Sequence, residues 1–126
     1  MEINAAWLNL PVQDLEASEK FYDTIGFTIK KHKDMMNKMR GIQTKDGQII
    51  MLIEKKQFEK VSRLSSIGNN EALVSLSVST KPEVDTLVSL VEQAGGNVLE
   101  TGTEHEGYYG ALFSDIDGHL FNVIVM

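Results

Sequence analysis

Two segments of the sequence resemble each other, and both follow an Asp-Gly pair. The chain ends DIDGHLFNVIVM over residues 115–126, and residues 46–54 read DGQIIMLIE. The two glycines, Gly47 and Gly118, lie 71 positions apart. Asp-Gly before an apolar run is typical of a turn that leads into a strand. The repetition therefore predicts that one structural module occurs twice in the chain.

The first half of the sequence predicts a strand, a helix and three further strands. NAAWLNLPV alternates apolar and polar residues as a strand does. Asp14 is a suitable N-cap for the helix LEASEKFYDTI, and Gly26 is suited to end it. The stretches FTIKKH, MRGIQTK and QIIMLIE follow as strands. KKQFEKVSRL is then predicted to be a short amphipathic helix and SSIGNNE a polar connection.

The same order of elements returns from residue 72 onward. ALVSLSV alternates as a strand, and the segment from Thr80 to Glu83 forms a capping box for a second helix. NVLETG, YYGALFSD and HLFNVIV are predicted to be three strands. The chain therefore reads βαβββ twice, in modules of about 1–55 and 70–126. We expect each module to need the other to bury its sheet.

Composition narrows the class of protein. A chain of 126 residues is long enough for one domain, and 42% hydrophobic with 24% charged residues is ordinary for a soluble protein. There are no cysteines, and the net charge of −6 argues against binding a phosphate backbone. The first ten residues do not resemble a secretion signal, and no apolar run is long enough to cross a bilayer. We therefore expect a cytoplasmic protein that binds neither nucleic acid nor membrane.

Two stretches, one at each end, carry a resemblance to a known family. LNLPVQDLEASEKFYDTIGF and FSDIDGHLFNVIVM resemble motifs of the glyoxalase / bleomycin resistance protein / extradiol dioxygenase superfamily, also called vicinal oxygen chelate proteins. Ile116 replaces the proline usual in the second motif. The resemblance implies an α+β fold in which residues 1–126 form a single domain, with duplicated βαβββ modules forming a cupped mixed sheet with helices outside. It also implies an active site in the cup and a homodimer.

Strand alternation predicts which side chains face such a cup. In the first strand the uniformly apolar side belongs under the helix, which leaves Asn9 on the cup side. In the strand at 73–78 the same reasoning leaves Ser75 and Ser77 on the cup side. Both sides of the last strand are apolar, so alignment with the family decides that Asn122 faces the cup.

In metal-using relatives one ligand stands on each of four equivalent strands. The resemblance carries these positions to Trp7, Met51, Leu73 and Asn122. Divalent cations of this kind prefer carboxylate oxygens or imidazole nitrogens, and among these four side chains Asn122 alone offers an oxygen. We therefore expect no metal and no cofactor. The predicted ligand-binding residues are Trp7, Asn9, Met51, Leu73, Ser75 and Asn122.

Candidates for acid–base chemistry lie near the end of the chain. The run Glu104-His105-Glu106 combines two carboxylates with an imidazole, and a solvated turn is the favoured interpretation. If this segment arches over the cup, these groups gain a role as acid or base. Tyr108 and Tyr109 alternate, so one of them must face the cup. Glu104, His105 and Tyr109 are thus the weak catalytic candidates.

Three functions follow from these features. The favoured one is a metal-free protein that binds a small, largely apolar or aromatic organic molecule in its cup, as bleomycin resistance proteins do. The alternative is an enzyme of the lactoylglutathione lyase or dioxygenase kind, with any metal held by a non-standard site. The third is a structural or interaction module whose cup is filled by its own side chains. Whether the chain is an enzyme stays open.

Overall fold

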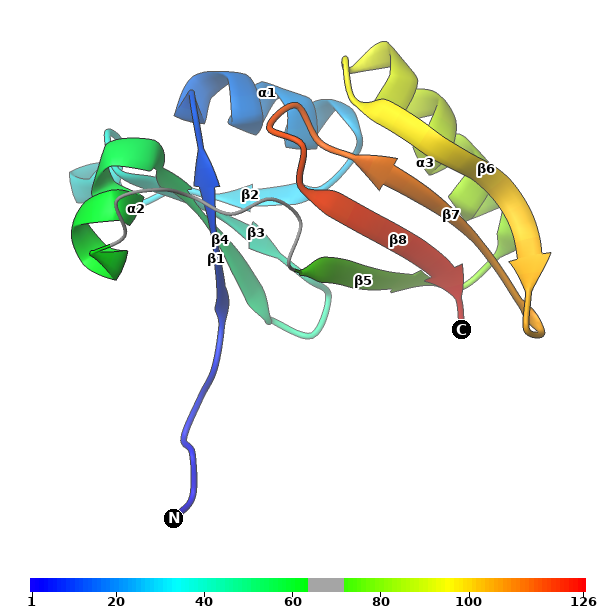
Figure 1. Cartoon of the computed structure of the whole chain (residues 1–126), viewed down its shortest axis with the longest axis horizontal. Coiled ribbons are helices and arrows are strands. Elements are labelled where there is room, and N and C mark those ends of the chain that lie inside the picture. Colours follow the sequence, from blue (N-terminus) through cyan, green and yellow to red (C-terminus); the bar gives the residue numbers. More distant parts are fainter. Residues whose placement is uncertain (64–71) are drawn as a thin grey trace. The chain divides into compact units, whose positions relative to one another are not determined.

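The computed structural model describes residues 1–63 and 72–126 (Figure 1). The polar connection predicted for SSIGNNE lies outside these residues. In the described chain the contacts separate two compact units, residues 1–23 with 27–63 and residues 24–26 with 72–126. No helix among the described residues combines the length and the apolar character needed to span a membrane.

The first unit contains the first predicted βαβββ module. Its strands form one mixed sheet in the order β1-β4-β3-β2, in which β1 runs parallel to β4 and the other neighbours are antiparallel. The short predicted helix is present as α2 and contacts β1 and β4. The elements are β1 (Leu8–Val12), α1 (Leu15–Thr24), β2 (Thr28–Lys30), the 3-10 helix η1 (Lys33–Met35), β3 (Met39–Gln43), β4 (Ile49–Glu54) and α2 (Lys55–Ser62).

The second unit repeats this topology. Its strands form a mixed sheet in the order β5-β8-β7-β6, with β5 parallel to β8 and antiparallel pairs elsewhere. Helix α3 lies along one face of this sheet and contacts β6, β7 and β8 (Figure 1). The elements are β5 (Leu73–Val78), α3 (Lys81–Gln93), β6 (Asn97–His105), β7 (Tyr108–Ser114) and β8 (Leu120–Val125). The duplicated α+β architecture expected from the sequence is confirmed.

The two sheets share not only their strand order but also their register. In the first sheet Met51 pairs with Asn9 on one side and with Gly41 on the other. In the second sheet Asn122 pairs with Ser75 and with Leu112 in the same way. Paired residues project from the same face of a sheet. Met51 and Asn122 therefore occupy equivalent positions, as the repeated sequence predicts.

The helix boundaries follow the capping signals read from the sequence. The carboxylate of Asp14 accepts a hydrogen bond of 3.1 Å from the backbone N–H of Ala17. The hydroxyl of Thr80 accepts from the N–H of Glu83, as the N-cap of the predicted capping box should, and it also donates to the Glu83 carboxylate. Gly26, with φ of +92°, follows α1 in a conformation that residues with a Cβ rarely adopt.

Burial alternates along the strands as predicted. Leu10 and Val12 of β1 are buried while Asn9 is exposed, and Val74 of β5 is buried while Ser75 is exposed. In β8 the buried residues are Phe121 and Val123, and Asn122 lies on the other side. The ring of Phe121 stacks on that of Phe113 from β7, with centroids 5.2 Å apart. The core of the second unit therefore lies on the face of the sheet that α3 covers.

A buried arginine joins α1 to β3 in the first unit. Arg40 is only 3% exposed, and its Nε donates to a carboxylate oxygen of Glu19 over 2.8 Å. Its Nη1 donates to the backbone carbonyls of Met36 and Met39. Lys31 contacts the second oxygen of Glu19 at 3.0 Å. The hydrogen bond from Arg40, followed by that from Lys31, lowers the pKa of Glu19 below its ordinary value of 4.5.

This lowered pKa makes the ion pair a source of acid sensitivity. The stability that Glu19 contributes is complete above its unfolded pKa of about 4.5 and is lost as pH falls through the lower folded pKa. We expect Glu19→Gln to reduce the free energy of unfolding by about 1–2 kcal/mol at neutral pH, with the difference from wild type shrinking below pH 4.5. Urea denaturation across this pH range measures the difference. Glu2→Gln in the exposed N-terminal segment is the control, and an E19Q deficit that does not change with pH would contradict the assignment.

Candidate functional site

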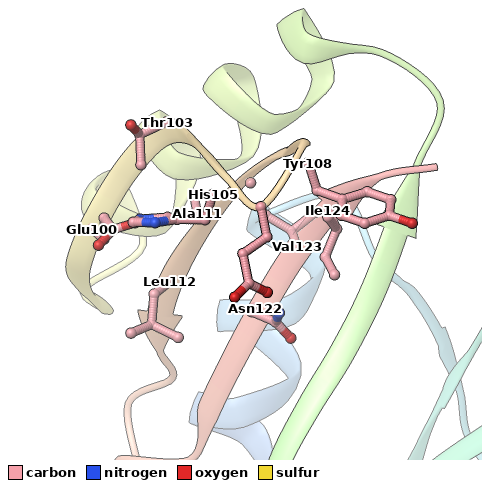
Figure 2. A pocket seen from close by; sticks show the side chains of 11 residues that line it. Glu100, Thr103, His105, Tyr108, Ala111, Leu112, Asn122, Val123 and Ile124 are labelled. Atoms are coloured by element: carbon pink, nitrogen blue, oxygen red, sulfur yellow. The ribbon is translucent and has the colours of Figure 1, made fainter.

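A pocket of about 350 Å³ opens on the face of the second sheet that α3 does not cover (Figure 2). Strand β8 contributes Asn122 and Ile124 to it, and β7 contributes Leu112 and Tyr108. Strand β6 and the turn after it add polar side chains, which are Glu100, Thr103, His105 and Glu106. The lining thus combines an apolar floor with a polar rim, as small-molecule sites usually do.

An irregularity in β6 between Glu100 and Thr103 places the polar side chains of the rim on one face. In a regular strand, Glu100 and His105 would project from opposite faces because they are an odd number of positions apart. The pairing of β6 with β7 shifts between Val98 and Glu100 and again between Glu100 and Thr103. Such bulges re-aim side chains. As a result Glu100 and His105 both line the pocket, where Nε2 of His105 lies 2.7 Å from Oε1 of Glu100.

The amide of Asn122 carries the clearest unsatisfied group in the pocket. Its Oδ1 is buried and has no hydrogen-bond partner among the described residues. A buried acceptor without a donor costs about 1–3 kcal/mol. Native structures rarely keep such a group without a reason, such as a missing ligand or water. Asn122 lies on β8 across from the Glu100–His105 pair (Figure 2).

A close approach of β7 to β8 shapes one end of the pocket. Gly110 lies in β7, and a Cβ at this position would lie 2.6 Å from the backbone carbonyl oxygen of Val123. No side chain fits at that distance, so glycine is required for these two strands to pair there. Both residues line the pocket.

The other two catalytic candidates face α3. The hydroxyl of Tyr109 donates to Asp85 on α3 over 2.6 Å, and this hydrogen bond raises the pKa of Tyr109 above its usual 10. Glu104 pairs with Lys81 at 3.0 Å, at the start of the same helix. Of the two tyrosines it is therefore Tyr108 that lines the pocket.

The interpretation of residues 104–106 as a solvated turn needs correction. Glu104 and His105 are the last two residues of β6, and they pair with β7. The turn itself is formed by Glu106, with φ of 49°, and Gly107. The strand continues beyond the predicted NVLETG because the two bulges let it curve while keeping its hydrogen bonds to β7.

Four of the other predicted ligand-binding residues lie in strands, on the face that corresponds to that of Asn122, and the fifth, Trp7, lies outside the strands. In the second unit, Leu73 and Ser75 begin β5, and both are exposed. In the first unit, Trp7 precedes β1 and is 64% exposed, Asn9 is exposed, and Met51 is partly buried. Of the six predicted residues, Asn122 is the one that lines the described pocket.

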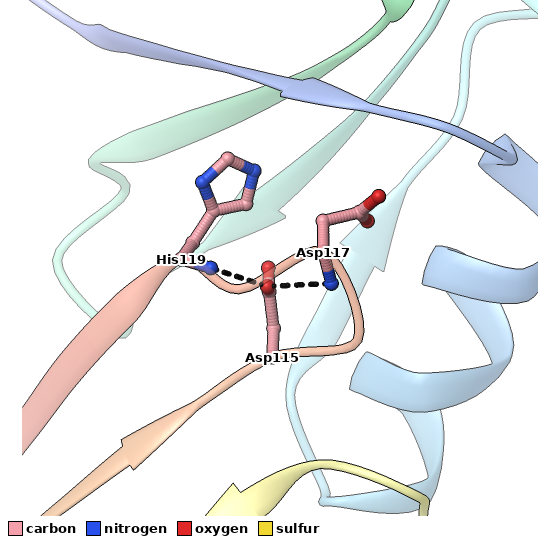
Figure 3. A group of neighbouring side chains, drawn as sticks. All are labelled: Asp115, Asp117 and His119. Carbon is pink, nitrogen blue, oxygen red and sulfur yellow. Dashed lines mark hydrogen bonds between the residues drawn. The ribbon is translucent and has the colours of Figure 1, made fainter. Parts of the chain in front are cut away.

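A second group of polar side chains lies in the turn before β8. Asp115, Asp117 and His119 have potential ligand atoms within 4.8 Å of one another. Asp115 is 4% exposed, and its Oδ1 accepts hydrogen bonds of 2.9 and 2.8 Å from the backbone N–H groups of Asp117 and His119 (Figure 3). The Asp115 carboxylate is therefore buried because it forms hydrogen bonds within the turn.

Metal-using relatives carry ligands at four positions, and the side chains that this chain has there do not fit a divalent cation. Indole N–H only donates, an aliphatic side chain offers nothing, and a thioether is a weak ligand for such ions. Asn122 offers a single neutral oxygen, and its Oδ1 is buried. No carboxylate or imidazole stands at any of these positions, which are Trp7, Met51, Leu73 and Asn122.

Sequence reasoning missed part of the pocket. Glu100 was not singled out because regular alternation does not place it with His105, and Thr103 was not singled out because the predicted strand ended before it. The bulge that brings these three residues together lies between Glu100 and Thr103, and its one signal in the local sequence is Gly102, because glycine inside a strand often marks a bulge. Leu112 was also missed. Its place beside Asn122 was visible in principle from the repeat, because Gly41 stands beside Met51 in the same way.

Comparison with known proteins agrees with this architecture. Residues 5–44 match the family model described as bleomycin resistance protein-like N-terminal. The chain is 46% identical to a hypothetical protein from S. aureus, with a TM-score of 0.91 over 100% of this chain and 96% of that one. Comparison with curated proteins gives no match.

More distant structures share the fold. A glyoxalase/bleomycin resistance protein/dioxygenase family enzyme from Burkholderia phytofirmans is 22% identical, with a TM-score of 0.79 over 94% of this chain and 95% of that one. A glyoxalase-related enzyme from Fulvimarina pelagi is 20% identical, with a TM-score of 0.83 over 98% and 88% of the two chains. The duplicated mixed sheets thus define a glyoxalase-like fold. The match of residues 5–44 to the bleomycin resistance protein-like model agrees with this fold.

Proposed function

We propose that this protein binds a small, largely apolar or aromatic organic molecule in the pocket on β6, β7 and β8, without a metal ion. The size of the pocket, about 350 Å³, falls at the lower end of the range for small-molecule sites. Leu112, Ile124 and the ring of Tyr108 offer apolar surface for a ring or a short chain. Metal-free binding is favoured because the four family positions lack suitable ligands.

The observation that carries the proposal is the unsatisfied Oδ1 of Asn122. A ligand that donates a hydrogen bond to this amide would remove the cost of the buried acceptor, so part of the binding free energy is already stored in the free protein. Asn122 lines the pocket, and because its Oδ1 is buried in the free protein, the proposal requires the side chain to rotate so that this oxygen meets the ligand. We therefore expect Asn122 to anchor the ligand, because it lines the pocket and its Oδ1 lacks a hydrogen-bond donor.

Replacing Asn122 by leucine tests this role, because leucine has a similar shape and no polar atom. We expect Asn122→Leu to raise the free energy of unfolding of the free protein by about 1 kcal/mol, since the unsatisfied acceptor is gone. The same change should weaken binding of 2-phenylethanol, a neutral aromatic with one hydroxyl donor, by about fivefold or more. Urea denaturation measures the first effect, and ligand-observed NMR in the presence of EDTA measures the second.

The control is Asn97→Leu at the exposed start of β6, outside the pocket. It makes the same chemical change and should leave binding unaltered. A variant N122L that is less stable and binds the alcohol as well as wild type does would contradict the proposal. Binding that disappears in EDTA and returns with added metal would instead favour the metal-dependent enzyme.

A further inference from the structure

We infer that the pocket selects a positively charged ligand, a small organic ammonium ion, over neutral or anionic molecules of the same shape. This inference rests on the proposed function, because it concerns the same pocket. The charged side chains around the pocket and the distribution of charge along the chain support it.

The polar rim of the pocket is rich in acceptors and carries negative charge. Glu100 and Glu106 both line it, as does Asn122, whose carbonyl oxygen is buried and has no partner among the described residues. Among the described residues, no lysine or arginine lines this pocket. One oxygen of Glu100 is engaged by His105, and the carboxylate as a whole still faces the pocket. An ammonium group offers up to three donors and a positive charge, which matches this set of acceptors.

The charge of the chain is strongly divided between its two halves. Residues 72–126 contain eight carboxylate side chains and a single lysine, whereas residues 1–63 contain nine carboxylates and eleven lysines and arginines. The single lysine, Lys81, is paired with Glu104 on the face that α3 covers. The unit that holds the pocket therefore has a net negative charge, whereas residues 1–63 have a small net positive charge. Its field attracts cations toward the pocket and repels anions.

The backbone of β6 indicates that this arrangement is built into the fold. A regular strand would turn either Glu100 or His105 away from the pocket, and the bulge between Glu100 and Thr103 keeps both side chains in it. The bulge therefore places the Glu100 carboxylate on the same side of β6 as Thr103 and His105. Acidic side chains scattered on a surface would need no such bulge.

Three probes of nearly equal shape test the inference. They are 2-phenylethylammonium, 2-phenylethanol and 3-phenylpropionate, which differ mainly in charge. We expect the ammonium ion to bind about fivefold to tenfold more tightly than the alcohol at low salt, and 3-phenylpropionate to show no binding. Added sodium chloride should reduce the preference, because salt screens partly exposed charges. Ligand-observed NMR titrations give the relative affinities.

Neutral isosteres identify the carboxylates responsible. Glu100→Gln and Glu106→Gln should each reduce the ammonium-to-alcohol preference by about twofold to fivefold, and the double variant should abolish it. Circular dichroism and urea denaturation check that all three variants remain folded. Glu92→Gln is the control, because this carboxylate is exposed on α3 and does not line the pocket.

The outcomes separate this inference from the proposed function. Equal binding of the ammonium ion and the alcohol would overturn charge selection and leave small-molecule binding intact. Tighter binding of 3-phenylpropionate would also overturn it. Failure of all three probes to bind would contradict both the inference and the function on which it rests.

Discussion

Replacing Phe121 by alanine is expected to lower the free energy of unfolding by about 3–5 kcal/mol, which would leave little of the stability of an average domain. Phe121 is fully buried in β8, and its ring stacks on the equally buried Phe113. The substitution removes this contact and opens a cavity that the surrounding strands can only partly close. Urea denaturation followed by circular dichroism measures the loss.

The neighbouring residue supplies a matched control. Leu120 belongs to the same strand and projects from the other face, where it is only partly buried. Leu120→Ala should therefore cost about 1 kcal/mol. Equal losses for the two variants would show that the core does not lie on the side of β8 that carries Phe121.

The second large effect is expected for Arg40→Met, which should reduce the free energy of unfolding by about 3 kcal/mol. Methionine fills much of the same volume, so the loss reports mainly on the guanidinium group. Without it, the carboxylate of Glu19 loses its 2.8 Å donor. The carbonyls of Met36 and Met39 lose theirs as well. Thermal and urea denaturation both measure the change.

Lys31→Met is the control for this experiment. Lys31 contacts the same carboxylate, but its side chain is 46% exposed, so its removal should cost no more than about 0.5 kcal/mol. The contrast follows from burial, because water cannot replace the donors that Arg40 provides. A Lys31 variant as unstable as the Arg40 variant would mean that net charge, rather than the buried hydrogen bonds, stabilises this part of the unit.

Most of the fold was predictable from the sequence, for reasons visible in particular residues. The Asp-Gly turns at Gly47 and Gly118, the capping residues and the alternation in β1 and β5 are local signals, and each is borne out. The repeat then predicted that Met51 and Asn122 are equivalent, and the register confirms it. Local chemistry fixes these features, so a single sequence is enough to read them.

The pocket was predictable only in part. Asn122 was identified from the repeat and the resemblance, and it lines the pocket. Glu100 was not identified, because its orientation depends on how β6 pairs with β7. The link between Arg40 and Glu19 was also missed, since two charged residues 21 positions apart give no sign of contact in the sequence. These are long-range features, and they are decided by tertiary packing.

The position of β6 at the outer edge of its sheet has a consequence for how such a protein can diversify. The residues that set the charge of the rim stand on this strand and on the turn after it, whereas the hydrophobic core depends on β7 and β8. Substitutions in β6 and in the turn after it can therefore change the charge of the rim with little loss of folding stability. One scaffold of this kind can serve a succession of different ligands while its interior stays the same.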